Sequence, residues 1–548
     1  MRPLLAIILV FLLLPSLPTP LVPSSGAKPV SLPEVHHPII YRPASLSSPG
    51  SPPFVPSDIR KAYNFLSLYS KGIKGNGTRI AIIDAYGDPS LSTDLSSFNS
   101  LTGLPPVTLN IFYPDGSPKR TDSGWALETA LDVEWAHSIA PSAQIDLVVA
   151  FDSSLGHIFD GIAYVANSLP NERVLSMSFG LAELSYPTTG SFTIPETHQL
   201  FVTITSHGTT PFASSGDSGA SSCCNPQYPS SDPLVVAVGG TSLTLNSDAS
   251  YGSETTWSGS GAGSSTVFAK PSWQQGLGDS MRDAVDVSYD ADPNTGVLVV
   301  QGGREFQVGG TSAGAPQWAA MVDLASEANS KTYGSINANL YKVASYHDVT
   351  SGSNGFFTAS AGWDYPTGFG TPDANEIVNA LSPTILVSLN STIVFQGSNV
   401  TTTGSLGILP TNGTLSGTTM VVARNSTTGA VLFNKTYSIP NMKLQNMTGV
   451  LQGTFLLSIG ISPYPLSSNI RVQEGAGSAL AVITVSRRVD TNGDGMVNIK
   501  DLSFVAGVFG STVNSPGYDG RADLDGNGVV NIVDLVLVAS YFGTLSFI

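Results

Sequence analysis

The feature that most constrains the fold is a series of short apolar runs, rich in β-branched residues, that alternate with helical patterns. One run is Arg79-Ile80-Ala81-Ile82-Ile83-Asp84, and similar runs lie at 145–150, 174–179 and 235–238. Strands without polar alternation are buried on both faces, as in parallel sheets covered by helices. Helical patterns fill the gaps, for example at 126–139 and 158–168. We therefore expect an α/β domain with a three-layer parallel sheet and a site at the carboxyl ends of its strands.

Composition and charge narrow the classes of protein that this chain can be. At 548 residues it is too long for one ordinary domain. Only 12% of the residues are charged and the formal net charge is −16, which argues against nucleic acid as a partner. The two cysteines, Cys223 and Cys224, are adjacent and cannot form a disulfide framework. Several domains and no nucleic-acid partner are expected.

The amino terminus has the pattern of a secretory signal. Arg2 precedes an apolar run at 4–14 that is too short to span a bilayer. Residues 1–27 are expected to be a signal peptide, with an uncleaved membrane anchor as the alternative. No later segment has about 18 uninterrupted apolar residues, so no transmembrane span is expected after signal removal. The protein is then secreted or held at the cell surface.

Changes of composition mark two further segments. Residues 28–53 are dense in proline and serine and are expected to form an extended arm before the α/β domain at 54–381. Residues 382–486 alternate threonine, valine and serine between turn dipeptides, which predicts a β-sandwich. This segment holds Asn-x-Ser/Thr triplets at Asn390, Asn399, Asn412, Asn425, Asn434 and Asn446. They indicate a glycosylated spacer, unless a sequence rich in serine, threonine and asparagine produces such triplets by chance.

The last segment, 487–548, carries two related twelve-residue loops. Oxygen-bearing side chains stand at loop positions 1, 3, 5, 9 and 12, and position 7 would bind through its carbonyl. The predicted calcium ligands are Asp490, Asn492, Asp494, Met496, Asn498 and Asp501 in one loop and Asp523, Asp525, Asn527, Val529, Asn531 and Asp534 in the other. An apolar helix follows each loop, so a small α-helical domain with up to two calcium ions is expected. Aspartate at position 12 and the tandem repeat resemble a type I dockerin, which implies a cohesin-type module as partner.

The stretch Gly309-Gly310-Thr311-Ser312-Ala313-Gly314-Ala315-Pro316 predicts a serine nucleophile at the start of a helix. Such a serine needs a base, usually histidine. His207 is followed by Thr210-Pro211, which cannot continue a helix, so a neutral subtilisin-like protease that uses His207 is only an alternative. The remaining histidines offer no better base. His36 and His37 lie in the arm, His137 is nine residues after Glu128 and on a different helical face, and His157, His198 and His347 have no partner motif.

The helical segment in which a histidine base would be expected carries carboxylates instead. Glu128 and Asp132 are four residues apart in a helical pattern, so they share one face, and apolar flanks imply that they share a proton. Asp84 meets the demand of a subtilisin for an aspartate after the first strand. Asp217 stands where subtilisins offer an asparagine amide to the oxyanion. Losing one such donor costs about 3–4 kcal/mol of barrier, so Asp217 must be protonated, which implies acidic pH or a strongly raised pKa of this carboxyl.

Together these motifs resemble the sedolisin family of serine-carboxyl peptidases. The resemblance covers about Phe54 to Leu381 and includes Ser214-Ser215-Gly216-Asp217-Ser218-Gly219. It implies a subtilisin-like fold with Ser312 as the nucleophile, Glu128 as its general base, and Asp132 as the residue that orients Glu128. Asp217 and the backbone N–H of Ser312 would form the oxyanion hole. Ser176, Ser178 and Gly180 would hold the substrate backbone by β-augmentation.

The same resemblance implies one calcium site late in the peptidase domain. Its ligands would be the carboxylates of Asp348 and Asp364 and the carbonyls of Val349, Ser360 and Gly362, with plain surface aspartates as the alternative. Sedolisins usually carry a large prodomain, whereas only residues 28–53 separate the predicted signal from the peptidase domain here. The family contains endopeptidases and tripeptidyl exopeptidases, which the sequence does not separate.

The first hypothesis is therefore a secreted, calcium-containing peptidase that cleaves polypeptides at acidic pH. The second is a surface or scaffold-attached binding protein whose peptidase domain is secondary or inactive.

Overall fold

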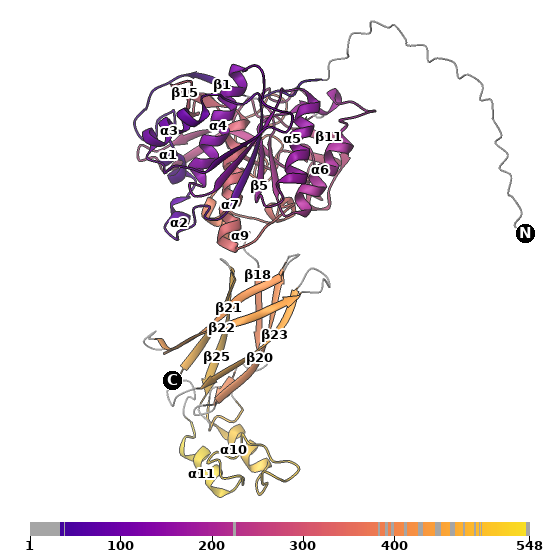
Figure 1. Ribbon diagram of the computed structural model, residues 1–548. Coiled ribbons are helices and arrows are strands. Elements are labelled where there is room, and N and C mark those ends of the chain that lie inside the picture. Colours follow the sequence, from indigo (N-terminus) through magenta and orange to yellow (C-terminus); the bar gives the residue numbers. More distant parts are fainter. Residues whose placement is uncertain are drawn as a thin grey trace, which may run out of the picture.

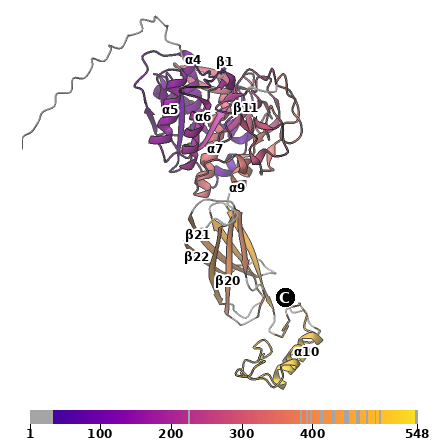
Figure 2. The same cartoon turned by 90° about the vertical axis from the view of Figure 1, so that its right-hand side faces the viewer.

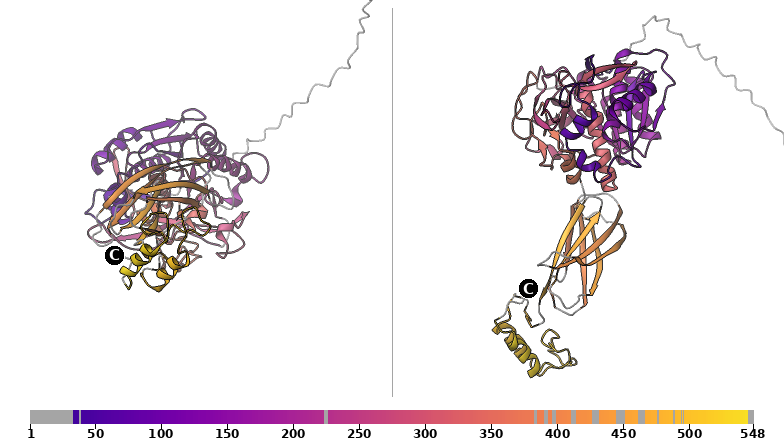
Figure 3. Two further views of the ribbon diagram at one scale, coloured as in Figure 1. Left: turned by 90° about the horizontal axis from the view of Figure 1, so that it is seen from below. Right: turned by 90° about the vertical axis from the view of Figure 1, so that its left-hand side faces the viewer.

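The structure, a computed structural model, describes residues 33–37, 39–222, 226–381 and 489–543 apart from Gly493 and Gly495, and the strand backbones between 384 and 486. Figure 1 and Figure 3 show a mixed α/β domain, a set of strands in orange, and two short helices in yellow, in chain order. The predicted signal at 1–27, Cys223 and Cys224 lie outside the described residues. In the described part of the chain, no helix combines the length and the apolar character needed to cross a membrane.

The first domain is built on an eight-stranded sheet with the order β10-β9-β7-β5-β2-β4-β3, and β13 pairs with β9. Its strands are β2 Arg79–Ala85, β3 Leu109–Phe112, β4 Gln144–Ala150, β5 Val174–Met177, β7 Thr210–Ser214, β9 Val236–Leu245, β10 Tyr251–Thr256 and β13 Val287–Asp290. Neighbouring strands run parallel except β9 and β10. The predicted apolar runs form β2, β4, β5 and the start of β9, so the expected parallel sheet is confirmed.

Helices cover both faces of this sheet. The larger helices are α3 Leu91–Thr102, α4 Ser123–Ile139, α5 Leu155–Ser168, α6 Ile194–Ser206 and α7 Gly314–Asn329. Along β2, Ile80 and Ile82 pack in the core under α4 and α7, whereas Ala81 and Ile83 pack in the core under α5 and α6. Successive side chains of a strand point to opposite faces, so the unbroken apolar run of β2 serves both cores. The three-layer architecture is therefore confirmed (Figure 1).

A small antiparallel sheet carries the strand that leads to Ser312. It has the order β1-β15-β14, with β1 Ile40–Pro43, β14 Val297–Gln301 and β15 Arg304–Gly309. The remaining elements of the domain are short. They are α1 Pro56–Ala62, α2 Leu66–Tyr69, β6 Leu181–Ala182, β8 Gln227–Tyr228, β11 Gly263–Ala269, β12 Met281–Ala284, α8 Asn337–Leu340, β16 Tyr346–His347, β17 Thr371–Pro372 and α9 Ala374–Ala380, with 3-10 turns η1 Glu183–Ser185, η2 Ser272–Gln274 and η3 Thr311–Ala313.

The second domain consists of two sheets, as a β-sandwich requires. One has the order β18-β20-β23 and the other β19-β25-β24-β21-β22. The strands are β18 Thr384–Leu389, β19 Ile393–Phe395, β20 Asn399–Leu409, β21 Thr414–Asn425, β22 Val431–Lys443, β23 Leu451–Gly460, β24 Leu466–Glu474 and β25 Gly477–Ser486. Figure 2 shows the long strands running along a common direction. Of the predicted glycosylation sites, Asn399, Asn425 and Asn434 fall in these strands, and Asn390, Asn412 and Asn446 lie outside the described residues.

The third domain is a pair of loop–helix units around α10 Ile499–Gly507 and α11 Ile532–Ser540. Each helix is capped by the asparagine before it, since the side chain of Asn498 accepts from the Lys500 N–H and that of Asn531 from the Val533 N–H. Their shared core contains Val497, Val505, Leu524, Val530 and Val538. The two units are thus structural repeats, as their sequences predict.

Candidate active site

Ser312 stands at a tight junction between β15 and α7. Gly310 has φ 120°, a conformation that favours glycine, and its N–H donates to the Ala291 carbonyl at 2.6 Å. The chain then forms η3, which contains Ser312, and continues directly into α7. The Ser312 side chain is fully buried. Its hydroxyl makes no hydrogen bond within the described chain, but it lies close enough to Glu128 to lower the pKa of that carboxyl.

Helix α4 supplies Glu128 and Asp132, both fully buried. The helix starts at Asp122, whose side chain accepts the N–H groups of Gly124 and Trp125 at 3.0 and 3.1 Å. The Ser178 hydroxyl donates to Asp132 Oδ1 at 2.8 Å. Burial, then the negative charges of Asp132 and Asp84, hold the pKa of Glu128 well above its usual range. Burial and Asp84 likewise raise the pKa of Asp132. The two carboxyls therefore cannot both ionise easily, as the sequence predicts.

A third carboxyl, Asp84, joins this pair from the end of β2. It is fully buried, and neither of its oxygens has a hydrogen-bond partner among the described side chains and backbone. Burial raises the pKa of Asp84 to about 7. From its sequence position, Asp84 is expected only as the counterpart of the subtilisin aspartate, and its charge interaction with Glu128 and Asp132 is a finding of the structure. Its position at the carboxyl end of a parallel strand, where ligands bind in α/β sheets, is the sequence feature that could have predicted this.

Asp217 approaches the nucleophile from the loop after β7. Its Oδ1 accepts two hydrogen bonds from Thr311, from the N–H at 2.8 Å and from the hydroxyl at 2.9 Å. Its Oδ2 is buried and has no partner in the described structure. Burial raises the pKa of Asp217 to about 8, although the Thr311 hydrogen bonds act in the opposite direction. Since Oδ1 already accepts twice, a proton on this carboxyl belongs on Oδ2, where it can be donated.

The three residues predicted to bind substrate lie in different surroundings. Ser176 is inside the central sheet, where its strand pairs with β2 at Ile82 and with β7 at Phe212. Its backbone is thus enclosed by neighbouring strands, and its predicted contact with a substrate is corrected. The Ser178 hydroxyl donates its hydrogen bond to Asp132. Only Gly180, beyond the end of β5, has backbone groups that pair with a segment outside the central sheet.

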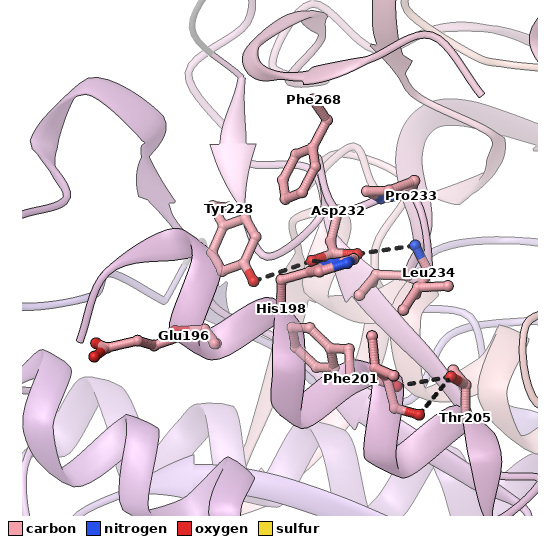
Figure 4. Close-up of polar contacts among 12 residues, drawn as sticks. Glu196, His198, Phe201, Thr205, Tyr228, Asp232, Pro233, Leu234 and Phe268 are labelled. Carbon is pink, nitrogen blue, oxygen red and sulfur yellow. Dashed lines mark hydrogen bonds and ion pairs between the residues drawn. The ribbon is translucent and has the colours of Figure 1, made fainter. Parts of the chain in front are cut away.

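The histidines do not form a subtilisin-type site. His207 is the residue after α6, and β7 begins at Thr210, so the Thr210-Pro211 sequence ends the helix as expected. His198 does have a carboxylate partner, because its Nδ1 lies 2.9 Å from Asp232 Oδ2 (Figure 4). However, His198 is on α6, which packs on the opposite face of the sheet from α7. The Tyr228 hydroxyl and the Leu234 N–H also donate to Asp232. The His198–Asp232 pair therefore links α6 to the loop after β8.

The predicted calcium ligands of the first domain come together in one loop region. Asp348 Oδ2 accepts the Gly362 N–H at 2.9 Å, and Asp364 Oδ2 accepts the Ser360 N–H at 2.9 Å. The negative charge of Asp348 contributes to the raised pKa of Asp364, so the two carboxylates are close. Val349 follows Asp348 directly and is buried. Carboxylates are hard oxygen donors of the kind that calcium takes, so Asp348 and Asp364 fit such an ion. The carbonyls of Val349, Ser360 and Gly362 stay predicted ligands.

The loops of the third domain also fit calcium. Carboxylate oxygens of Asp490, Asp494 and Asp501 lie within 4.8 Å of one another, as do those of Asp523, Asp525 and Asp534. In the second loop Gly528, at position 6, has φ 86° and makes the sharp turn that such loops need. Asp501 and Asp534, at position 12, each accept backbone N–H groups from both ends of their loops. The amides of Asn492 and Asn527 donate to Asp494 and Asp525, and those of Asn498 and Asn531 donate to the carbonyls of Met496 and Val529. These residues stay predicted ligands.

Comparison with known proteins gives matches to the first and third domains. A family model described as the dockerin type I domain matches residues 488–543. Kumamolisin of Bacillus sp. (strain MN-32) is 30% identical over 365 residues, 60% of this chain and 64% of that protein. Sedolisin of Pseudomonas sp. (strain 101) is 31% identical over 335 residues, 54% of this chain and 56% of that protein. The chain thus spans less than two thirds of the length of either relative.

A solved structure extends the match to the fold. Pseudomonas sedolisin, described as a serine-carboxyl proteinase in complex with two molecules of pseudo-iodotyrostatin, aligns with a TM-score of 0.54 and 28% identity. The alignment covers 61% of this chain and 98% of that chain. Tripeptidyl-peptidase sed4 of Aspergillus fumigatus is also similar, at 25% identity over 61% of this chain and 68% of that protein. The similar proteins thus include one named as a tripeptidyl-peptidase.

Proposed function

We propose that this chain, whose first domain belongs to the sedolisin family and whose C-terminal segment is a type I dockerin domain, is a secreted peptidase that cleaves polypeptides at acidic pH. The observation that carries the proposal is the buried cluster of carboxyls beside Ser312. Burying several carboxyls costs free energy unless they are protonated, and such clusters are common at catalytic sites. A buried group of carboxyls beside a serine is the arrangement that serine-carboxyl chemistry needs.

Bond cleavage would begin at Ser312. Its Oγ attacks the carbonyl carbon of the peptide bond while Glu128 takes the hydroxyl proton. Asp132, held by Ser178, shares a proton with Glu128 and so keeps its charge tolerable inside the domain. Glu128 then gives its proton to the leaving nitrogen, the C–N bond breaks, and an acyl-enzyme forms. A water molecule then attacks the acyl carbon and gives a proton to Glu128. Glu128 passes a proton to the Ser312 Oγ as the ester bond breaks, which releases the acid product and restores Ser312.

Asp217 would stabilise the negative oxygen of the tetrahedral intermediate. The Thr311 hydrogen bonds fix Oδ1, so Oδ2 carries the proton that is donated to this oxygen. Below a pH of about 8, the pKa to which burial raises Asp217, the carboxyl stays neutral. An ionised Asp217 would instead repel the developing charge. This requirement favours a pH below about 8. The raised pKa of Glu128 acts in the opposite direction, because the base must be ionised to take the Ser312 proton.

Peptide hydrolysis between pH 2 and pH 8 tests the assignment. Ser312→Ala should abolish turnover, and Glu128→Gln should lower kcat by at least about 100-fold, the usual contribution of a general base. Glu134→Gln is a matched control, because Glu134 is a buried glutamate of the same helix that accepts the Val300 N–H instead of meeting Ser312. Wild-type rates in both Ser312→Ala and Glu128→Gln would refute the proposal. Whether products are tripeptides or internal fragments, read by mass spectrometry, decides between exopeptidase and endopeptidase action.

Calcium would stabilise the chain at up to three places. Asp348, Asp364 and the carbonyls of Val349, Ser360 and Gly362 would hold one ion in the peptidase domain. The two loops at 490–501 and 523–534 would each hold one ion and fix the start of α10 and α11. Calcium has no step in peptide hydrolysis in this proposal.

A second role, attachment through the third domain, is supported by the exposed apolar side chains of Ile499, Ile532, Val533 and Val536. Ile499 and Ile532 occupy equivalent repeat positions and are each 61% exposed. Apolar side chains presented in this way favour a protein partner. For a dockerin domain that partner would be a cohesin-type module. Capture on an immobilised cohesin module, with calcium and then with chelator, tests this role, and Ile499→Asp combined with Ile532→Asp should abolish it.

A further inference from the structure

A small cavity lies at the carboxyl ends of the neighbouring strands β2 and β4. Its volume is about 160 Å³. The chain leaves β2 for α3 on one face of the sheet and leaves β4 for α5 on the other face, as Figure 1 shows. In α/β sheets, ligands bind in the crevice where the chain diverges in this way. Ser312, Glu128, Asp132 and Asp217 are not among the described residues that line the cavity, so it is separate from the candidate active site.

The buried side of the cavity is apolar. Its lining includes Leu91 at the start of α3, Ile111 of β3, and Leu147 and Val149 of β4. Leu91, Leu147 and Val149 belong to the core under α3 and α4 and are each 1% exposed. Sites for drug-sized ligands measure about 300–1,000 Å³, so a cavity of this size suits a single aliphatic side chain.

The exposed rim of the cavity carries a cation. The guanidinium carbon of Arg120 lies 4.9 Å from the centre of the Tyr86 ring, and its Nη2 donates to the Tyr86 hydroxyl at 2.6 Å. Glu34 and Asp122 act on the charge of Arg120, but neither forms an ion pair with it in the described structure. Because the Tyr86 oxygen accepts from Arg120, its own O–H can be donated elsewhere. A guanidinium and a hydroxyl side by side are suited to bind a carboxylate.

The backbone at Tyr86 is strained. Its φ is 59°, which bulky residues rarely adopt, and the side chain is nonetheless buried. The next residue, Gly87, approaches β4 so closely that an added Cβ would meet Val149 Cγ1 at 3.2 Å. Strained residues cluster at ligand and catalytic sites, where the surrounding structure holds them in place. The turn after β2 therefore fixes Tyr86 beside Arg120.

A carboxylate oxygen without a partner also belongs to the cavity. Asp88 lines it, and Asp88 Oδ1 accepts the Ser90 N–H at 2.9 Å. Its Oδ2 is buried and has no hydrogen-bond partner in the described structure. Buried polar atoms are normally hydrogen-bonded, so this oxygen can accept an N–H from a ligand. The cavity thus combines an apolar side, a place for a carboxylate and an acceptor for an N–H.

We propose that this cavity binds an apolar amino-acid residue with a free carboxylate, such as a leucine at the end of a peptide. Arg120 and the Tyr86 hydroxyl hold the carboxylate, Asp88 accepts the N–H, and the aliphatic side chain fills the apolar side. A free amino acid offers the same groups, with an ammonium in place of the amide. Peptide hydrolysis produces such carboxylates, a link that rests on the proposed function, whereas the binding itself does not.

The test measures binding in the full chain with Ser312→Ala, by ligand-observed NMR at pH 5.5. An α-carboxyl has a pKa of about 3.5 and is ionised at this pH. N-acetyl-leucine should bind about tenfold or more tightly than N-acetyl-leucinamide, which lacks the charge. Arg120→Met should remove this difference. Arg42→Ala is the matched control, since it changes another exposed arginine, in β1, and should leave the difference intact.

Two further comparisons identify the source of the ligand. Tighter binding of free leucine than of N-acetyl-leucine, lost in Asp88→Asn, supports a free amino acid, and equal or weaker binding supports the end of a peptide. A preference for leucine that survives Asp88→Asn would overturn the role of Asp88. Equal affinity for acid and amide, an undiminished difference in Arg120→Met, or no binding at millimolar concentrations would overturn the site. Binding by a chain whose wild type cleaves no peptide would instead remove the peptidase proposal alone.

Discussion

Replacing Asp217 with asparagine isolates the effect of one proton. The amide keeps an oxygen to accept from Thr311 and places an N–H₂ group where Oδ2 stands, so the geometry is preserved at every pH. In the wild type, burial raises the pKa of Asp217 from 3.8 to about 8. The folded state then retains a proton that the unfolded chain releases above about pH 4. Stability is therefore fully present at low pH and is lost as pH rises toward 8.

The size of this loss follows from the difference between the two pKa values. With about 1.4 kcal/mol per pKa unit, Asp217 makes the folded state less stable by about 2–3 kcal/mol between pH 4 and pH 6, and by about 5 kcal/mol between pH 4 and pH 8. A typical domain is stable by only about 5–15 kcal/mol, so the effect is measurable. Asp217→Asn should lack this share of the pH dependence.

Denaturant unfolding at pH 4, 6 and 8 measures the effect. The chain has six tryptophans, Trp125, Trp135, Trp257, Trp273, Trp318 and Trp363, all in the first domain, so their fluorescence follows that domain alone. In activity, Asp217→Asn should keep turnover at higher pH than the wild type, whereas Asp217→Ala should lose about 100-fold to 1000-fold in kcat. If the asparagine variant loses stability with pH as steeply as the wild type, Asp217 is not the protonated group.

Three further predictions use other parts of the molecule. Asp84→Asn removes a carboxyl that is neutral below its pKa of about 7 and whose charge raises the pKa of Glu128 above it, so the pH–rate profile should change near pH 7 and stay unchanged at acidic pH; an unchanged profile near pH 7 would exclude Asp84 from the cluster. Arg282→Met leaves Asp286, its fully buried ion-pair partner at 2.6 Å, without a cation, and should destabilise the first domain by about 3–5 kcal/mol in the tryptophan assay; a loss below about 1 kcal/mol would contradict this. Chelation of calcium should speed hydrogen exchange in α10 and α11, and Asp501→Ala should do so with calcium present; unchanged exchange would show that the loops need no ion.

Local patterns predicted much of the fold and of the site. The unbroken apolar run of β2 predicted a parallel sheet because only a strand buried on both faces lacks polar alternation. The spacing of Glu128 and Asp132 predicted a shared face, and the repeat of loop and helix predicted the C-terminal pair of units. These features depend on residues close together in sequence.

The features that the sequence did not predict depend on contacts across the chain. Asp84 meets Glu128 only because β2 ends beside the middle of α4. His37 meets Glu128 only because the arm pairs at Gly180 and at Gly309, more than a hundred residues away in each case. Backbone pairing of this kind needs no particular side chains, so a proline-rich arm carries no local sign of it.

The pairing of β1 with β15 has a consequence for how the chain behaves in solution. An uncovered strand edge is a template for pairing with other copies of a chain. β1 covers one edge of the strand that ends at the Ser312 junction, so it shields that edge from intermolecular contact. Loss of β1 would therefore expose this edge and favour pairing between copies of the chain.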